Sequence, residues 1–338
     1  MKVRPISLAL QGGGAHGAFT WGVLDYLLEE GSLDIKAMTA TSAGAMNAVA
    51  LVAGYLDGGR DGAREMLSAF WKDISERGTP LSAANSISPA FGPFTPFAMF
   101  QALSQVASPY DLNPFDYNPL LQSLRKLIDF ERLNAESDIQ LFVAATNVQT
   151  GKAKIFRTPE LTEEAILASA CLPQVFRAVE IDNIPYWDGG YVGNPSLFPL
   201  FYADVPRDML IVHINPMNRA STPKTAAAIL DRLNEITFNA SLISELRSIA
   251  FVQKLLDENW LADRMQSKYR KIHVHAIRAD KQLSKLSIES KFDTSWRFLT
   301  DLRNRGRDAA KTWIQTSRKK VGKQSSVNIR EEFLDNLD

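Results

Sequence analysis

The stretch LALQGGGAHGAF at residues 8–19 decides how the rest of the chain is interpreted. An apolar run, typical of a buried strand, stops at three consecutive glycines, and the chain then continues with helical spacing. In a strand–glycine–helix turn the backbone N–H groups point outward, and the helix dipole also favours an anion there. Gly12, Gly13 and Gly14 therefore predict an anion cradle, because close approach of a ligand leaves no room for side chains.

Short β-rich runs alternate with helix-like segments along the whole chain. The runs that predict strands lie at residues 6–10, 35–40, 139–146, 209–214 and 272–277. Helices are expected directly after the first two of them, at 16–30 and 43–56. This alternation predicts an α/β fold with a central, largely parallel sheet between helices, because nearly continuous apolar strands must be covered on both faces.

A long amphipathic pattern after Pro223 predicts one or two extended helices. The apolar stripe that we expect to pack on the sheet comprises Ile229, Leu233, Ile236, Ile243, Leu246, Ala250 and Gln253. Because a further strand is predicted at 272–277, residues 216–338 are expected to form a mainly helical extension on the same core.

Composition excludes several classes of protein. The 338 residues contain 38 basic and 38 acidic side chains, so no net charge favours nucleic acid as a partner. Cys171 is the only cysteine, and no paired metal ligands accompany it, which favours a reducing compartment and no metal. No apolar run reaches the length of a membrane span, so we expect a cytoplasmic protein.

A second motif, TATSAGAMNAVAL at residues 39–51, predicts a catalytic serine. A strand that runs into a tight turn, with a serine between small residues and a helix directly after it, is typical of a nucleophile elbow. Ser42 would then project its hydroxyl above the sheet. The usual G-x-S-x-G pattern reads Ala40, Thr41, Ser42, Ala43, Gly44 here, with alanine at the first elbow position.

A serine hydroxyl needs a neighbouring base, which the sequence must also supply. Asp188 follows an aromatic run in IPYWDGGYVGNP, and the Gly189–Gly190 turn would direct its carboxylate at a strand end. His16, beside the glycines, suits substrate contact or helix capping better than the role of base. The other histidines lie in strand-like runs, where packed imidazoles are expected: His213, His273 and His275.

The segment between about residues 78 and 119 is rich in proline, serine and phenylalanine. Phe91, Phe94 and Phe97 recur at every third position, while the intervening prolines prevent a regular helix. Two interpretations stay open: a small core folded under a loop, or a lid that contacts lipid.

The glycine turn, the T-S-A-G-A elbow and the segment ASACLPQVFRAVEIDNIPYWDGGYVGNP together resemble the patatin-like phospholipase family over residues 5–215. This resemblance implies a three-layer fold with residues 5–215 as the catalytic domain. It also implies a Ser42–Asp188 dyad and hydrolysis of acyl esters without calcium or another cofactor. The implied oxyanion hole comprises Gly12, Gly13, Gly14 and Ala43.

The predicted function is therefore that of a lipid acyl hydrolase, of phospholipase A or lysophospholipase type, which acts through an acyl-enzyme. Its expected partner is a lipid or membrane surface, with peripheral attachment as the second possibility for its location. The alternatives are a catalytically weakened binding or scaffold protein, as Ala40 suggests, and an acyltransferase or intracellular polyester hydrolase. A nucleotide-dependent enzyme that uses the glycine turn is a further alternative. Head-group preference and oligomeric state stay open.

Overall fold

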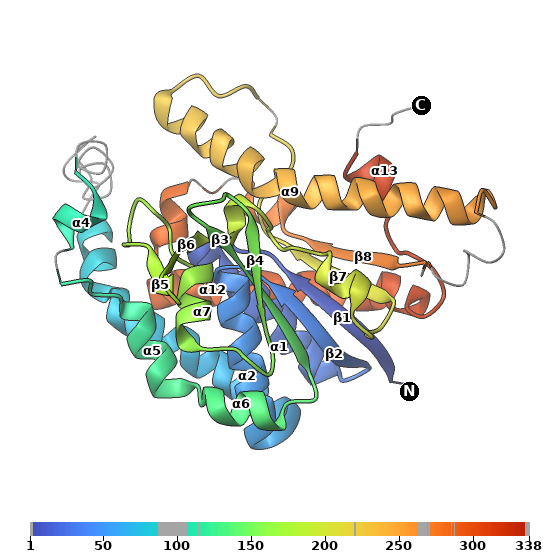
Figure 1. Ribbon diagram of the computed structural model, residues 1–338, viewed down its shortest axis with the longest axis horizontal. Helices are drawn as coiled ribbons and strands as arrows, with labels where there is room; N and C mark the ends of the chain where they lie inside the picture. Colours follow the sequence, from blue (N-terminus) through green and yellow to red (C-terminus); the bar gives the residue numbers. More distant parts are fainter. Residues whose placement is uncertain are drawn as a thin grey trace.

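The computed structural model describes residues 3–86, 107–113, 115–219, 221–261, 269, 271–284, 286 and 288–334. Within these residues the chain forms one mixed sheet of eight strands between layers of helices (Figure 1). The three-layer α/β arrangement confirms the predicted fold class. Phe91, Phe94 and Phe97 lie outside the described residues, so the interpretation of that segment stays a prediction.

The sheet is built around five parallel strands. In spatial order these are β3 (Gln140–Asn147), β2 (Leu33–Ala40), β1 (Arg4–Leu10), β7 (Asp208–His213) and β8 (His273–Arg278). All five predicted strands are thereby confirmed. Three further strands join the sheet by antiparallel pairing: β4 (Ala153–Arg157) and β6 (Ile184–Asp188) each pair with β3, and β5 (Val179–Ile181) pairs with β6. The carboxyl ends of β1 and β2 lie at one edge of the sheet. The end of β6 reaches the same edge, because β6 pairs in antiparallel fashion with the last residues of β3, and Asp188 lies opposite Ala145.

Two helices follow β1 and β2, as predicted. β1 leads through the short helix η1 (Gly14–His16) into α1 (Gly17–Glu30), and β2 leads into α2 (Ala43–Ser86). α2 extends far beyond the expected end at residue 56, with a break at Gly58 and Gly59. It continues because the residues after the break bury a second apolar stripe in the core, which comprises Ala63, Leu67, Phe70, Trp71 and Ile74.

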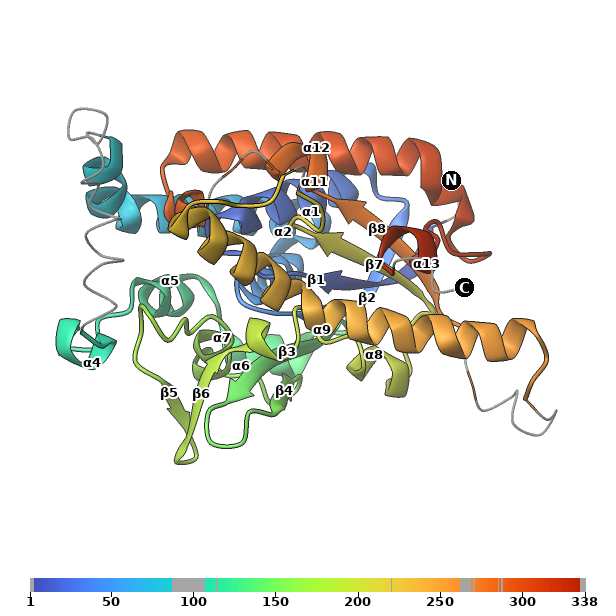
Figure 2. The ribbon, with the colours of Figure 1, turned by 90° about the horizontal axis from the view of Figure 1, so that it is seen from above.

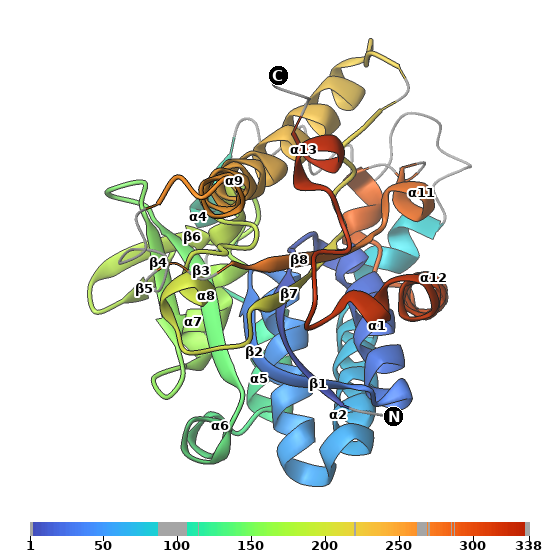
Figure 3. The same ribbon diagram turned by 90° about the vertical axis from the view of Figure 1, so that its right-hand side faces the viewer.

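Helices from the last third of the chain cover both faces of the sheet. α12 (Trp296–Ser317) packs on α1, while α9 (Ala226–Asp257) lies on the opposite face (Figure 2). Gly22 and Gly306 allow the close approach of α12 to α1, because a Cβ on either would lie about 2 Å from a backbone oxygen of the other helix. The region after residue 215 therefore contacts the same core as the first two hundred residues (Figure 3).

Short helices complete the described part of the chain. They are α4 (Pro109–Leu112), α5 (Pro119–Leu127), α6 (Phe130–Glu136), α7 (Glu163–Ser169), η3 (Gly189–Tyr191), α8 (Pro199–Tyr202), α11 (Asp280–Leu283), η4 (Ile288–Phe292), η5 (Arg318–Lys320) and α13 (Ile329–Glu332). No helix among the described residues is long and apolar enough to cross a membrane.

The prediction for α9 is correct in length but wrong for part of its buried face. Ile229, Leu233 and Ile236 are exposed, although the apolar stripe predicts that they pack on the sheet. The face that packs on the sheet contains Leu242, Leu246, Ile249 and Ala250, and toward its amino-terminal end it continues as Glu235, Phe238 and Asn239. Because buried polar side chains occupy this face, apolar periodicity alone selects the wrong side of the first turns.

Candidate active site

Ser42 stands in a strained turn between β2 and α2. Its φ of 55° lies in the left-handed region, which costs a residue other than glycine about 1–3 kcal/mol. The turn is tight, because a Cβ on Gly44 would lie 2.3 Å from the carbonyl oxygen of Leu10. Ala40, the last residue of β2, is fully buried, so its methyl group is accommodated at the first elbow position. The sharp strand–turn–helix geometry is that of a nucleophile elbow.

The glycine turn after β1 lies directly against this elbow. A Cβ on Gly12 would lie 2.6 Å from the Ser42 Cβ atom. Gly14 adopts a φ of 59°, a conformation that favours glycine. The N–H of Ala43, at the first position of α2, has no acceptor within its own helix. No acceptor for the N–H groups of Gly13, Gly14 or Ala43 is present in the described part of the chain.

Gly12 is used differently from the other two glycines. Its N–H donates to Oδ1 of Asn194 at 2.7 Å, and its carbonyl accepts from Nδ2 of Asn215 at 2.8 Å. The predicted role of Gly12 as an oxyanion donor is therefore corrected, because its only backbone donor already has a partner. In this structure Gly12 ties the turn to Asn194 and Asn215.

Asp188 ends β6 and is completely buried. The backbone holds it from both sides: its N–H donates to the Cys171 carbonyl at 2.8 Å, and its own carbonyl accepts from Thr146 Oγ1 at 2.7 Å. Gly189 has no room for a side chain, since a Cβ there would lie 2.1 Å from the Ala144 carbonyl oxygen. The Gly190 N–H donates to Asp188 Oδ1 at 2.7 Å, which orients the carboxyl group.

The structure brings Ser42 and Asp188 together. Thr41 Oγ1 donates to the Gly193 carbonyl at 2.7 Å and so joins the elbow to the segment after Asp188. The Ser42 hydroxyl is close enough to act as a hydrogen-bond donor that lowers the pKa of Asp188. The contact falls short of full hydrogen-bond geometry, because Asp188 Oδ2 has no complete partner among the described residues. Catalytic hydrogen bonds are often loose before substrate binds.

Burial dominates the electrostatics of Asp188. It raises the pKa of the carboxyl to about 7, against the opposing effects of the Gly190 N–H, the Ser42 hydroxyl and the positive charge of Lys291. A carboxyl with a pKa near neutrality is a far better proton acceptor at pH 7 than an ordinary aspartate.

A buried network of carboxamides supports both turns, and sequence reasoning did not find it. Gln11 Oε1 accepts from the N–H groups of Ile214 and Asn215, at 2.8 and 2.9 Å. Its Nε2 donates to the Asn194 carbonyl and to Asn239 Oδ1. Gln11 directly precedes the glycine turn, and Asn194 directly follows Gly193. A polar residue that borders a glycine motif is a feature that sequence analysis can recognise. Asn239 carries no such signal, because it lies inside a helix.

Three histidines, His16, His213 and His275, are buried and hydrogen-bonded within the fold. The sequence predicts substrate contact for His16, but its ring is buried and Nε2 lies 2.7 Å from Ser290 Oγ of η4. Burial, followed by the charges of Lys291 and Arg219, lowers the pKa of His16 to about 3. The ring is thus covered by protein where the prediction requires an open face. His213 and His275 are buried and bonded to Asn239 and Asp208, as expected for packed imidazoles.

Comparison with known proteins identifies the family. The model of the family named patatin-like phospholipase matches residues 8–204, more than half of the chain. The chain belongs to the patatin-like phospholipase family. Membership supports lipid ester hydrolysis as the activity class at the level of the family. The matched region contains the glycine turn, the elbow and the Asp188 turn, and it ends before β7. No curated protein matches the chain.

Similar solved structures come from bacterial proteins. VipD from Legionella pneumophila is 15% identical with a TM-score of 0.43, and the alignment covers 98% of this chain and 73% of that one. The type III effector protein ExoU is 14% identical with a TM-score of 0.35, over 93% of this chain and 53% of that one. ExoU from Pseudomonas aeruginosa, in complex with SpcU, is 18% identical with a TM-score of 0.34, over 94% and 61% of the two chains.

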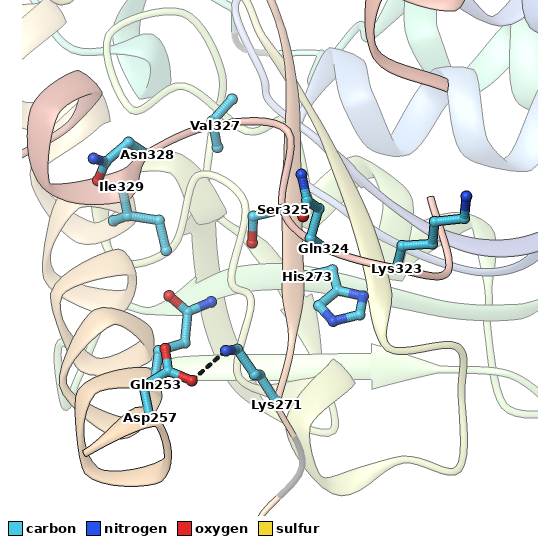
Figure 4. Close-up of a pocket in the computed structure, with 10 residues that line it drawn as sticks. All are labelled: Gln253, Asp257, Lys271, His273, Lys323, Gln324, Ser325, Val327, Asn328 and Ile329. Atoms are coloured by element: carbon cyan, nitrogen blue, oxygen red, sulfur yellow. Dashed lines mark hydrogen bonds and ion pairs between the residues drawn. The ribbon is translucent and has the colours of Figure 1, made fainter. Parts of the chain in front are cut away.

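A polar pocket of about 370 Å³ lies away from this site, at the amino-terminal end of β8 (Figure 4). Its lining includes His273, Lys323 and Ser325, and Lys271 in its wall forms an ion pair with Asp257. None of the predicted site residues line it. The candidate active site lies instead beyond the carboxyl ends of β1 and β2.

Proposed function

We propose that this protein is a lipid acyl hydrolase in which Ser42 is the nucleophile and Asp188 the base. The observation that carries the proposal is the position of the Ser42 hydroxyl, in a strained elbow, beside a buried carboxyl whose pKa is raised to about 7. Family membership supports the same class of reaction. We also propose that the reaction requires no calcium or other metal, since each step below uses groups of the chain and water.

The reaction begins when Asp188 accepts the proton of Ser42 as Oγ attacks the ester carbonyl carbon. The resulting oxyanion would accept hydrogen bonds from the N–H groups of Gly13, Gly14 and Ala43, each group of this kind contributing about 2.7–4 kcal/mol. Collapse of the tetrahedral intermediate breaks the ester bond, and the proton on Asp188 passes to the departing alcohol. Water then attacks the acyl-enzyme, returns a proton through Asp188 and releases the fatty acid and free Ser42.

A lipid surface as the partner has support on the outer face of α9. Four side chains, which we call the α9 ridge, are 42–53% exposed: Ile229, Leu230, Leu233 and Ile236. Phe238, on the other face of the same turns, contacts Gly190 and Tyr191 beside the catalytic carboxyl. The amino-terminal half of α9 projects beyond the body of the molecule (Figure 1). An apolar ridge adjacent to the site suits contact with acyl chains at a bilayer surface.

Hydrolysis assays with two kinds of substrate test the proposed function. The wild-type protein should release acid from nitrophenyl esters in the presence of EDTA, at higher kcat/KM for long than for short acyl chains. It should also release fatty acid from phosphatidylcholine vesicles. Equal rates at all chain lengths would contradict a lipid site, and the appearance of transesterified product with an added alcohol would favour the acyltransferase alternative.

Replacing Leu233 and Ile236 of the α9 ridge by serine should reduce hydrolysis of vesicles about thirtyfold, because each of the two side chains that no longer enters the bilayer forfeits roughly 1 kcal/mol. Hydrolysis of a soluble short-chain ester should stay within twofold of wild type, since the ridge lies on the outer face of the helix. Exposed Thr237, the residue after Ile236, offers the control Thr237→Ser. An equal loss on both substrates would show that the ridge supports the fold and does not contact lipid.

A further inference from the structure

The segment η4 brings a lysine from outside the family-matched region to the candidate active site. Lys291 lies in Ile288–Phe292, more than eighty residues beyond the end of the match at residue 204. Its backbone closes over the glycine turn, because a Cβ on Gly14 would lie 2.5 Å from the Lys291 carbonyl oxygen. His16, at the end of the same turn, contacts Ser290 of this segment. The turn after β1 is thus covered by the C-terminal region.

The ammonium group of Lys291 supports the glycine turn through one intermediate residue. Nζ donates to Asn215 Oδ1 at 2.9 Å, and Asn215 Nδ2 donates to the Gly12 carbonyl at 2.8 Å. Asn215 is 1% exposed, so its bond to Gly12 is sheltered from water, while Lys291 itself is half-buried. Because the donor at its start is charged, the bond to Asn215 is of the stronger class. Movement of Lys291 would therefore weaken one of the two side-chain anchors of Gly12, Asn215, while the bond from the Gly12 N–H to Asn194 would remain.

The same ammonium also reaches the turn that carries Asp188. Nζ lies 5.4 Å from the ring centroid of Phe238, within the range of a cation–π contact. The Phe238 ring packs directly on Gly190, since a Cβ there would lie 2.0 Å from its Cε1 atom. Gly190 in turn donates to Asp188 Oδ1. One cation thus reaches both turns through one side chain each, Asn215 for the glycine turn and Phe238 for the Asp188 turn.

We propose that Lys291 is a positioning residue for the ester hydrolysis: through Asn215 and Phe238, its ammonium group holds the glycine turn and the Asp188 turn at the spacing that proton transfer from Ser42 requires. This inference rests on the proposed function. It also gives the C-terminal region, which lies beyond the matched residues 8–204, a role in the site besides packing on the core.

Among the residues that the structure describes, few charged or titratable groups face Asp188. The positive charge of Lys291 lowers the pKa of Asp188, in opposition to burial. Cys171 and Tyr191 also interact with the carboxylate, but burial raises the pKa of Cys171 to about 12 and that of Tyr191 above its usual value, so both are neutral near pH 7. Ser42 and the Gly190 N–H contribute hydrogen bonds without charge. Lys291 is therefore the group whose charge biases the base.

The test compares three substitutions of Lys291 on a soluble ester over pH 5–9. Lys291→Met removes the charge and the donor, Lys291→Gln keeps a donor, and Lys291→Arg keeps the charge. Lys311→Met, on the exposed face of α12, is the control for loss of one positive charge. Lys291→Met should move the acidic limb of kcat/KM upward by about one pH unit, which lowers the rate below pH 6 about tenfold, and should also lower the plateau. Lys291→Arg should keep the limb at its wild-type position, and Lys291→Gln should shift the limb with less loss of plateau.

A measurement without substrate keeps the inference separate from the proposed function. With carbon-13 labelled aspartate, the Asp188 carboxyl resonance, identified by its absence in Asp188→Asn, should titrate at higher pH in Lys291→Met than in wild type. If wild type lacks esterase activity but this shift occurs, the proposed function fails while the effect of Lys291 on the carboxyl stands. An active wild type with no shift in either experiment overturns the inference. So does an equal, pH-independent loss in Lys291→Met and Lys291→Arg, which would indicate only a structural role.

Discussion

Replacing Ser42 by alanine is expected to lower kcat/KM for ester hydrolysis by about 10⁴-fold or more, in line with removal of the nucleophile from other serine hydrolases. No acyl-enzyme can form without Oγ. The backbone amides could then stabilise only the oxyanion that forms when water attacks the ester directly. Stability should change little, because Ser42 donates to Ser169 through its backbone N–H, which alanine retains. The comparison is steady-state kinetics on a nitrophenyl ester beside a thermal melt of the same samples.

The matched control is Ser248→Ala, which removes an exposed hydroxyl that contacts only the backbone of its own helix, α9. A fluorophosphonate probe should label wild type and Ser248→Ala but not Ser42→Ala, because it reacts only with an activated serine. Retained hydrolysis and labelling in Ser42→Ala would refute the assignment of the nucleophile. Loss of hydrolysis with a lowered melting temperature would instead point to damage at the elbow.

The parts of the fold that sequence predicts well are those fixed by local chemistry. β1 and β2 are short apolar runs followed by small-residue turns, and their helices begin where those turns end. The end of α2 was not predictable, because the breaking pair Gly58–Gly59 interrupts the helix without ending it, and the apolar stripe after it packs on partners distant in sequence. The buried face of α9 was mispredicted because Glu235 and Asn239 are polar yet face inward.

The candidate site shows the same division. Ser42, Asp188 and the glycines were identifiable, because an elbow and a carboxylate on a Gly–Gly turn leave signatures within a few residues. Gly12 was assigned a ligand-facing amide, although only the fold reveals that Asn194 occupies it. Lys291 could not be found from sequence at all. Its effect depends on η4 returning across some 270 residues of chain to the glycine turn, and one lysine in a polar segment carries no local signal.

Replacing Asp188 by asparagine is expected to lower kcat/KM about as far as Ser42→Ala, by roughly 10⁴-fold, because asparagine cannot accept the Ser42 proton. The double variant should lose little more than either single one, since the two residues act as a unit. Asparagine can still accept from the Gly190 N–H through Oδ1, so the turn should be preserved. Full additivity of the two losses would show that Asp188 and Ser42 do not act in one proton transfer.

The same substitution should stabilise the protein, but only at higher pH. The pKa of the Asp188 carboxyl rises from 3.8 in the unfolded chain to about 7 in the folded protein. Well below pH 3.8 the group is protonated in both states, and aspartic acid and asparagine should be nearly equivalent. Between about pH 4 and 7 the unfolded chain releases the proton that the folded wild type retains, so the stability of wild type relative to Asp188→Asn falls through this window and levels off above pH 7, at a difference of roughly 4 kcal/mol.

Urea unfolding of wild type and Asp188→Asn at pH 4, 6 and 8 measures this difference directly. The two curves should nearly coincide at pH 4 and separate progressively, with the inactive variant the more stable at pH 8. The loss of activity and the gain of stability in Asp188→Asn would then have one cause. The active site keeps a carboxylate that destabilises the fold because the reaction needs a base. A wild type that is equally stable relative to the variant at all three pH values would mean that Asp188 is solvated and titrates normally. A proton acceptor tuned to neutral pH would then be missing from the mechanism.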